Sequence, residues 1–200
     1  MGKKITLSVL IATVPNRIST FYPRLINSLL VQTENKDVEI LGLFDNKKRS
    51  VGEKRNDLIS LAQGKYLTFI DDDDWIAGDY VDSILTCLAA NPDADCVVFD
   101  CITTVNGDVN KRTYSKYSIR YRKYSQTAEK VDGYLQWRGK PAHTMVWKSE
   151  IAKRHTYKSI NYAEDVDWVG RASQDIKQEV RIDKVLYYYD FDSKVSETRG

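Results

Sequence analysis

Four consecutive aspartates, from Asp71 to Asp74, follow an apolar run and precede Trp75. Carboxylates this close repel one another, and the fold alone does not require such a cluster. A bound cation would offset the repulsion. In an extended backbone alternate side chains share a face, which would pair Asp71 with Asp73. Mg²⁺ and Mn²⁺ suit such oxygen ligands and commonly share them with a substrate phosphate. The cluster therefore predicts a metal and diphosphate site, and a solvated acidic turn is the alternative.

The first half of the chain contains the elements that would position this cluster. Strand and helix patterns alternate there, which is typical of a parallel sheet covered by helices. Ser50 and Glu53 have the spacing of a capping box that opens a helix, and Gly64 is placed to end it. Ligands of such sheets bind at the carboxyl ends of the strands, where Asp45 and the aspartate cluster are expected. The predicted elements are strands over residues 4–13, 38–44 and 66–70 and helices over residues 21–30, 50–64 and 79–90.

The pattern changes after a predicted strand over residues 96–105. Asn106-Gly107 is a hairpin signal, and the stretch that follows is polar and rich in tyrosine. Further along, the pattern predicts strands over residues 143–147 and 180–189 and a short helix over residues 164–172. The second half is therefore predicted to be mixed α+β.

The segment from Gly52 to Trp75 has the most specific pattern of the chain. It contains Arg55-Asn56, then Ala62-Gln63-Gly64-Lys65-Tyr66, and a strand that ends in Asp71-Asp72-Asp73-Asp74 before Trp75. The segment resembles glycosyltransferase family two, whose members carry an Arg-Asn pair, an Ala-x-Gly-x-Tyr strand and a DxDD motif followed by an aromatic residue. The resemblance implies an α/β fold of the GT-A type, with a mostly parallel nucleotide-binding sheet flanked by helices. It also implies one domain over residues 1–200, in which residues 1–105 bind the nucleotide sugar and residues 106–200 hold the acceptor and the catalytic base.

The resemblance also implies an activity and a donor site. The activity is transfer of a sugar from a nucleotide sugar, in the first place a UDP-sugar, to an acceptor hydroxyl with inversion. Asp73 would be the principal ligand of Mn²⁺ or Mg²⁺, Asp71 would contact the ribose or the metal, and Arg55 would lie near the phosphates. A solvated helix charge is the alternative for Arg55, and a strand-end cap is the alternative for Asp45. The donor-binding residues are expected to be Thr13, Val14, Pro15, Arg17, Asp45, Arg55, Asp71 and Asp72.

The pair Glu164-Asp165 looks like the family's Glu-Asp motif, in which the aspartate is the catalytic base of inverting enzymes. By that resemblance Asp165 is the base and Glu164 is its neighbour in the site. A sugar hydroxyl is a poor nucleophile, and a carboxylate within hydrogen-bond reach can accept its proton as the new bond forms. The alternative is an acidic pair that is stabilised by the dipole of a helix N-terminus.

The late histidine that completes the metal shell in many relatives has no counterpart here. His143 and His155 are the only histidines, and both come too early. Asp190 or Asp192 could supply an oxygen ligand instead, and we assign Asp192 to the metal; solvated strand-end carboxylates are the alternative. His143 is expected to lie in a strand at the start of the acceptor side and to pack there, with substrate contact as the alternative. Trp137 and Trp168 are expected either to stack on an acceptor sugar or to be buried.

Composition limits the other classes of function. The 30 basic and 28 acidic residues leave a net charge of +2, which gives no global field that would recruit nucleic acid or an anionic membrane. There is no apolar run of about 18 residues and no secretory signal pattern, so we expect a cytoplasmic protein without a transmembrane segment. Cys87, Cys96 and Cys101 lack metal-site or disulfide spacing and are expected to be inert buried thiols.

Two rival functions remain open. Residues 111–124 alternate lysine or arginine with tyrosine and contain no acidic residue, so they could hold phosphates and stack on bases as a nucleic-acid-binding module. Solvated hairpin strands have the same alternation. The strip could also hold an anionic acceptor, so the expected partners are a nucleotide-sugar donor and a saccharide, lipid-linked or other hydroxyl acceptor. A nucleotidyltransferase lacks support because no Gly-rich phosphate loop follows the first strand.

Overall fold

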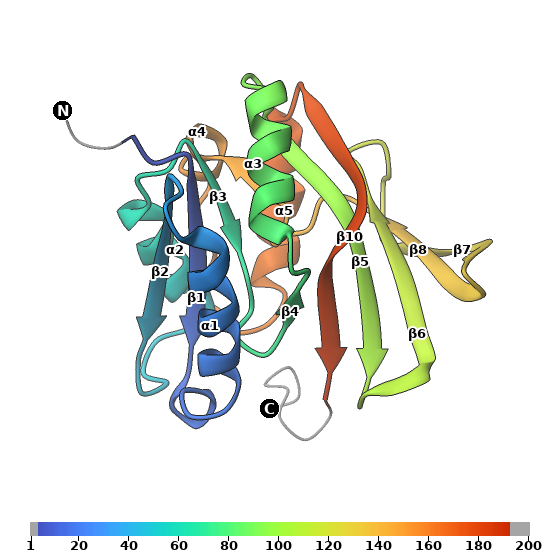
Figure 1. Cartoon of the computed structure of the whole chain (residues 1–200), viewed down its shortest axis with the longest axis horizontal. Helices are drawn as coiled ribbons and strands as arrows, with labels where there is room; N and C mark the ends of the chain where they lie inside the picture. The colour runs from blue at the N-terminus through green and yellow to red at the C-terminus, as the bar shows by residue number, and fades with distance from the viewer. Residues whose placement is uncertain (1–3, 193–200) are drawn as a thin grey trace.

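The computed structural model describes residues 4–192, in which ten strands form one mixed sheet with helices on both faces (Figure 1). The strand order along the sheet is β2-β1-β3-β9-β5-β6-β8-β7, and β10 pairs with both β4 and β5. The elements of the first half are β1 (Leu7–Thr13), η1 (Pro15–Arg17), α1 (Phe21–Thr33), β2 (Val38–Phe44), α2 (Val51–Leu61), β3 (Tyr66–Phe69), β4 (Trp75–Ile76) and α3 (Tyr80–Ala90). Those of the second half are β5 (Cys96–Val105), β6 (Asp108–Tyr117), β7 (Ser125–Val131), β8 (Tyr134–Gly139), β9 (Val146–Lys148), α4 (Ser149–Ala152), α5 (Glu164–Ala172), η2 (Ser173–Asp175) and β10 (Glu179–Phe191).

Strands β2, β1 and β3 form the parallel part of the sheet, with Leu7 of β1 opposite both Val38 of β2 and Tyr66 of β3. In Figure 1, α1 lies in front of this part of the sheet, with α3 beside it toward β5 and β10, and α2 and α5 lie behind the sheet. Strand β9 runs antiparallel to both β3 and β5 and so joins the two halves of the sheet. The carboxyl ends of β1 and β3 therefore meet at one edge, as expected for a ligand-binding α/β sheet.

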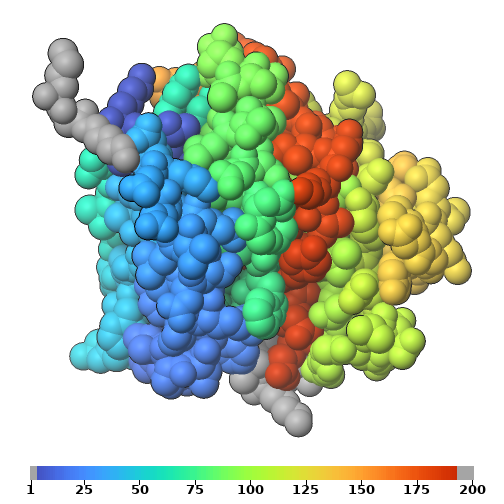
Figure 2. Space-filling model, in the orientation of Figure 1, coloured from blue at the N-terminus to red at the C-terminus, as the bar shows by residue number. Residues whose placement is uncertain are grey.

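The second half extends the sheet away from the parallel strands. Strand β10 runs parallel along β5, and β6 folds back on β5 through the turn at Asn106 and Gly107. Both turn residues have positive φ, 53° and 68°, as the predicted hairpin requires. Strands β7 and β8 form a second hairpin at the edge, which projects beside β6 on the right of Figure 2. The mixed α+β prediction for this half is confirmed.

Most predicted elements are present, and several boundaries differ: β1 begins only at Leu7, and α1 continues to Thr33. The capping box is confirmed, because Ser50 Oγ accepts from Glu53 N at 3.2 Å and Glu53 Oε2 accepts from Ser50 N at 2.8 Å. Helix α2 ends at Leu61 rather than at Gly64. The strand predicted over residues 143–147 is β9, which starts only at Val146 because the preceding residues form a turn at the cleft.

The core lies between the sheet and its helices. Trp147, Trp168 and Tyr80 are among its largest fully buried side chains. Cys96 and Cys101 are buried free thiols, as expected, whereas Cys87 is only half-buried; burial raises the pKa of all three. Over residues 4–192, no helix combines the length and the apolar character needed to cross a bilayer.

Candidate active site

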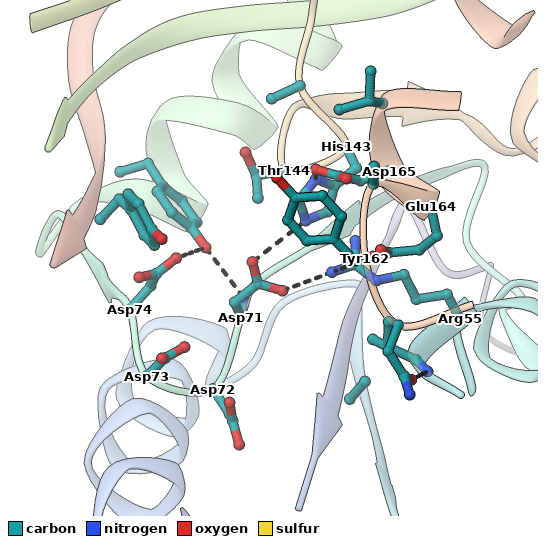
Figure 3. A pocket seen from close by; sticks show the side chains of 18 of the residues that line it. Arg55, Asp71, Asp72, Asp73, Asp74, His143, Thr144, Tyr162, Glu164 and Asp165 are labelled. Atoms are coloured by element: carbon teal, nitrogen blue, oxygen red, sulfur yellow. Dashed lines mark hydrogen bonds and ion pairs between the residues drawn. The ribbon is translucent and has the colours of Figure 1, made fainter. Parts of the chain in front are cut away.

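The four aspartates form a turn after β3 and not an extended strand. Asp74 N donates to Asp71 O at 3.1 Å, so the predicted alternation of faces was wrong. Arg24 of α1 holds this turn from outside, because its Nη2 donates to the carbonyl oxygens of Asp73 at 2.9 Å and Asp74 at 3.1 Å. The same guanidinium lies over the ring of Trp75, 3.4 Å from its centroid. The turn directs the carboxylates toward different partners, as Figure 3 shows.

Two of the carboxylates are held by the loop after β1. Thr13 Oγ1 donates to Asp72 Oδ2 at 2.5 Å, and Arg17 Nη1 donates to Asp72 Oδ1 at 2.7 Å. Arg17 Nη2 also lies 2.9 Å from Asp73 Oδ2. The sequence prediction that Thr13 and Arg17 act at the same site as the cluster therefore agrees with their positions.

Arg55 of α2 connects Asp71 with the second half of the chain. Its Nη2 lies 3.0 Å from Asp71 Oδ1 and 3.5 Å from Glu164 Oε1. Burial alone would lower the pKa of Arg55, but the charges of these two carboxylates outweigh burial and raise it. Arg55 is therefore a buried cation between two acidic groups, and the alternative of a solvated helix charge is wrong.

His143 lies between Asp71 and Asp165 (Figure 3). Its Nε2 is 3.4 Å from Asp71 Oδ2, and its Nδ1 is 3.4 Å from Asp165 Oδ2. The side chain is buried, and its ring packs at a tilt against Phe69, with ring centroids 6.2 Å apart. Sequence reasoning weighed packing against substrate contact for His143 and did not foresee the pairing with the two carboxylates, because no local pattern indicates that residues 71, 143 and 165 meet.

The electrostatics divide these carboxylates into two kinds. Burial would raise the pKa of Asp165, but the hydrogen bond and charge of His143, together with Arg55, lower it to about 2. The pKa of Asp71 is lowered in the same way, since Arg55 and His143 outweigh its burial. Burial raises the pKa of Asp73 to about 6, and the charges of Asp71 and Asp72 add to that effect. Asp165 is thus firmly ionised at neutral pH, whereas burial and the neighbouring charges disfavour the ionised form of Asp73.

Asp74 is the most buried member of the cluster. Burial raises its pKa well above the usual range, and the neighbouring charges of Asp71 and Asp73 raise it further. Tyr187 Oη donates to Asp74 Oδ2 at 2.5 Å, whereas the buried Oδ1 has no hydrogen-bond partner. This unpaired oxygen and the raised pKa of Asp73 indicate that the cluster lacks positive charge.

A divalent cation shared with a ligand fits this donor set better than an all-protein metal site. Among residues 4–192, no three His, Cys, Asp or Glu side chains converge in a way that could hold a metal ion. Mg²⁺ and Mn²⁺ commonly take only one or two protein carboxylates and complete their shells with water and substrate phosphates. The Asp71–Asp74 turn can supply such carboxylates.

The aspartate turn and the Glu164-Asp165 pair line one cleft of about 1060 Å³ between the two halves of the sheet. Loop residues after β1 and β2 and the start of α2 form one wall, and β5, β6, β8 and β10 form the other. Of the predicted site residues, those that line the cleft are Thr13, Val14, Arg17, Arg55, Asp71, Asp72, Asp73, Glu164 and Asp165. A glycosyl transferase family 2 model matches residues 32–154, which include the aspartate turn and most of the second wall. The chain belongs to glycosyl transferase family 2.

By its sequence the chain is thus classed among the family 2 glycosyltransferases. Its fold is similar to that of crystal structures of TarS residues 1–349 from S. aureus, at 16% identity and a TM-score of 0.64, over 93% of this chain and 60% of TarS 1–349. The complex of TarS with UDP-GlcNAc gives 15% identity and a TM-score of 0.63, over 93% of this chain and 58% of that one. This glycosyltransferase chain therefore spans about 60% of the length of these structures, and the GT-A fold prediction is confirmed. No curated protein sequence matches the chain.

Three predicted site residues of this glycosyltransferase do not line the cleft: Pro15, Asp45 and Asp192. Asp45 accepts from Lys47 N at 3.2 Å, Arg49 N at 3.1 Å and Lys54 Nζ at 3.2 Å, so it caps the loop after β2, as the strand-end alternative proposed. Local hydrogen bonding to nearby backbone N–H groups is a common use of Asp at such a position.

Of the two late candidates for a metal ligand, Asp192 directly follows β10 and lies off the cleft. Asp190 Oδ1 accepts from Thr104 Oγ1 at 2.6 Å and Gly107 N at 3.1 Å, so Asp190 supports the β5–β6 hairpin.

The tyrosine-rich strip contributes rings to the second wall of the cleft. Tyr124 is stacked between Tyr117 and Trp137, with centroid distances of 6.5 and 5.0 Å, and all three line the cleft. Trp168 instead lies in the core, stacked on Tyr157 at 4.9 Å, so it cannot meet an acceptor. The sequence left both roles open for the two tryptophans, and only Trp137 is placed to touch a ligand.

Proposed function

We propose that this glycosyltransferase transfers a sugar from a UDP-sugar to an acceptor hydroxyl, with inversion, and that it depends on Mn²⁺ or Mg²⁺. The observation that carries the proposal is the position of Asp71 and Asp165 on opposite nitrogens of His143, 3.4 Å from each. The carboxylates that would hold the donor's cation and the carboxylate that would accept the proton thus share one cleft. The fold neighbour whose structures hold UDP and UDP-GlcNAc supports the choice of nucleotide.

On the donor side, Asp73 and Asp71 would hold the cation. When bound, the cation would stabilise the negative charge that develops on the departing diphosphate. Arg17 orients Asp72 and Asp73, and Arg55 fixes Asp71 through an ion pair, so the carboxylates are in place before the donor arrives. Such preorganisation lowers the cost of reaching the reactive arrangement.

On the acceptor side, Asp165 would take the proton of the attacking hydroxyl. Its pKa of about 2 keeps it ionised at neutral pH and makes it a weak base. Proton transfer to such a base becomes favourable only as the hydroxyl gains acidity during bond formation. His143 contacts the carboxylate, and both side chains line the cleft. The expected acceptor is a saccharide, a lipid-linked sugar or another hydroxyl compound bound along Tyr117 and Trp137.

A thermal-shift screen tests the donor assignment. Ligands that bind only the native state raise its apparent stability, by about 2.7 kcal/mol at a hundredfold excess over Kd. UDP, ADP and GDP should be compared with and without Mn²⁺ on the wild type and on Asp73→Ala. We expect UDP to stabilise the wild type most, and mainly with Mn²⁺, and Asp73→Ala to lose the metal-dependent part. Equal stabilisation of both proteins by UDP with Mn²⁺ would contradict the assignment.

A further inference from the structure

Helix α2 makes an unusually close contact with the segment that precedes α5. Gly52, in the first turn of α2, faces the backbone of this segment, and a side-chain carbon at Gly52 would overlap the carbonyl oxygen of Lys158. Gly52 N donates to Ile160 O at 3.3 Å. Glycine is normally unfavourable in a helix, by about 1 kcal/mol relative to alanine. Its presence at this position is explained by the approach of the second backbone.

Two further residues of α2 bind the same segment. Asn56 Nδ2 donates to Tyr157 O at 2.9 Å, and Asn56 Oδ1 accepts from Tyr157 N at 2.7 Å. One side chain thus satisfies both backbone groups of a residue 101 positions away in the chain. Val51 N donates to Asn161 Oδ1 at 2.9 Å. The segment Tyr157–Asn161 is therefore attached to α2 at both of its ends.

The attached segment leads directly to the proposed base. Ala163 has a φ of 59°, in the left-handed region that costs a residue with a side chain about 1–3 kcal/mol. The chain turns sharply there, and α5 begins at Glu164, so Glu164 and Asp165 enter the cleft in its first turn. A strained residue persists only where its surroundings fix it on both sides. The contacts with α2 fix one side, and the packing of α5 fixes the other.

We propose that Gly52 and Asn56 are positioning residues that set the place of Asp165 in the cleft. They act through the backbone of Tyr157–Asn161 and do not touch the reacting groups. Arg55, between them in sequence, contacts both Asp71 and Glu164, so the start of α2 connects a donor-side carboxylate with the residue next to the proposed base. The inference rests on the proposed role of Asp165 as the base.

The test compares Gly52→Ala and Asn56→Ala with Gly170→Ala, a matched control in α5, where an added side-chain carbon would meet nothing within 4 Å. The probe is UDP release from UDP-GlcNAc with Mn²⁺ and with water as the acceptor. A displacement of about 1 Å in a catalytic group can cost about a hundredfold in rate. We expect UDP release to fall about 10- to 100-fold in both variants, with UDP affinity within about twofold of the wild type, and no change in Gly170→Ala. Asn56→Asp keeps the acceptor for Tyr157 N and provides a milder variant should Gly52→Ala unfold.

A double-mutant cycle with Asp165→Asn separates positioning from general damage to the fold. If Gly52 and Asn56 act through Asp165, their substitutions should cost little further rate once that carboxylate is gone. Losses that add in the double mutants would overturn this inference and leave the base assignment intact. The same holds if Asn56→Ala and Asn56→Asp release UDP at the wild-type rate while Asp165→Asn is impaired. Wild-type UDP release from Asp165→Asn itself would overturn the base assignment, which is a different result.

Discussion

His143 Nδ1 lies 3.4 Å from Asp165 Oδ2, and this pairing is the main reason that the pKa of Asp165 falls to about 2 despite its burial. The proposed base, Asp165, is therefore held in its ionised form by a neighbour from the loop before β9. The first prediction follows from this pairing.

Asp165→Asn should reduce sugar transfer by about 100- to 10,000-fold, the usual loss when a general base is removed. Asn has the size of Asp, and residue 165 lies inside the first turn of α5, whose N-cap is Ala163, so no capping bond is lost and the fold should be retained. UDP affinity should barely change, because Asp165 has no assigned contact with nucleotide or metal. Single-turnover transfer and UDP titration measure the two effects separately, and Asp73→Ala is the contrast that should lose both. Transfer by Asp165→Asn at the wild-type rate would exclude Asp165 as the base.

Asp73→Asn should stabilise the ligand-free protein at pH 8 and not at pH 4. The pKa of Asp73 is about 6 in the folded protein against a usual value of 3.8, so the native state binds the proton more tightly than the unfolded chain. Stability is then lost as pH rises from about 4 to 6, by an amount on the order of 1 kcal/mol or more. Urea unfolding at the two pH values measures the difference. A variant that is less stable than the wild type at pH 8 would show that Asp73 is stabilised there by Arg17 and needs no cation.

Trp137→Ala should raise the KM for the acceptor and leave UDP affinity unchanged. Trp137 lines the cleft on β8, on the wall opposite the loop after β1. Aromatic stacking contributes about 0.5–1.5 kcal/mol, so the expected rise in KM is about 2- to 10-fold. Initial rates over a range of acceptor concentrations give the value, and Tyr134→Ala on the same strand is a control because Tyr134 lies off the cleft. Equal effects of the two substitutions would remove Trp137 from the acceptor site.

Ser50→Ala should lower the free energy of unfolding by about 1 kcal/mol through loss of the capping box. Ser50 Oγ accepts from Glu53 N, and its backbone N–H is bound by the Glu53 carboxylate. Ser60→Ala is the matched control, since Ser60 lies in the last turn of the same helix and binds only Asp57 O. Urea unfolding of the three proteins gives the comparison, and a loss in Ser60→Ala as large as that in Ser50→Ala would rule out a specific effect of the cap.

The sequence by itself determined the features that depend on neighbouring residues. Hydrophobic periodicity located the strands and helices, the Ser50–Glu53 spacing placed the start of α2, and Asn106-Gly107 placed the β5–β6 turn. These features are local because capping and tight turns involve residues only a few positions apart. The order of strand, aspartate cluster and Glu164-Asp165 also sufficed to indicate the family.

Only the tertiary structure decided how those carboxylates are partnered. His143 meets Asp71 and Asp165 across 72 and 22 positions of the chain, and Arg55 meets Glu164 across 109. Such contacts depend on which strands and loops become neighbours, and hydrophobic spacing carries no information about that. The same holds for Asp45, whose charge is used by its own loop, and for the turn that replaced the expected extended aspartates. Local patterns thus selected the chemical groups, and long-range packing set their charges and directions.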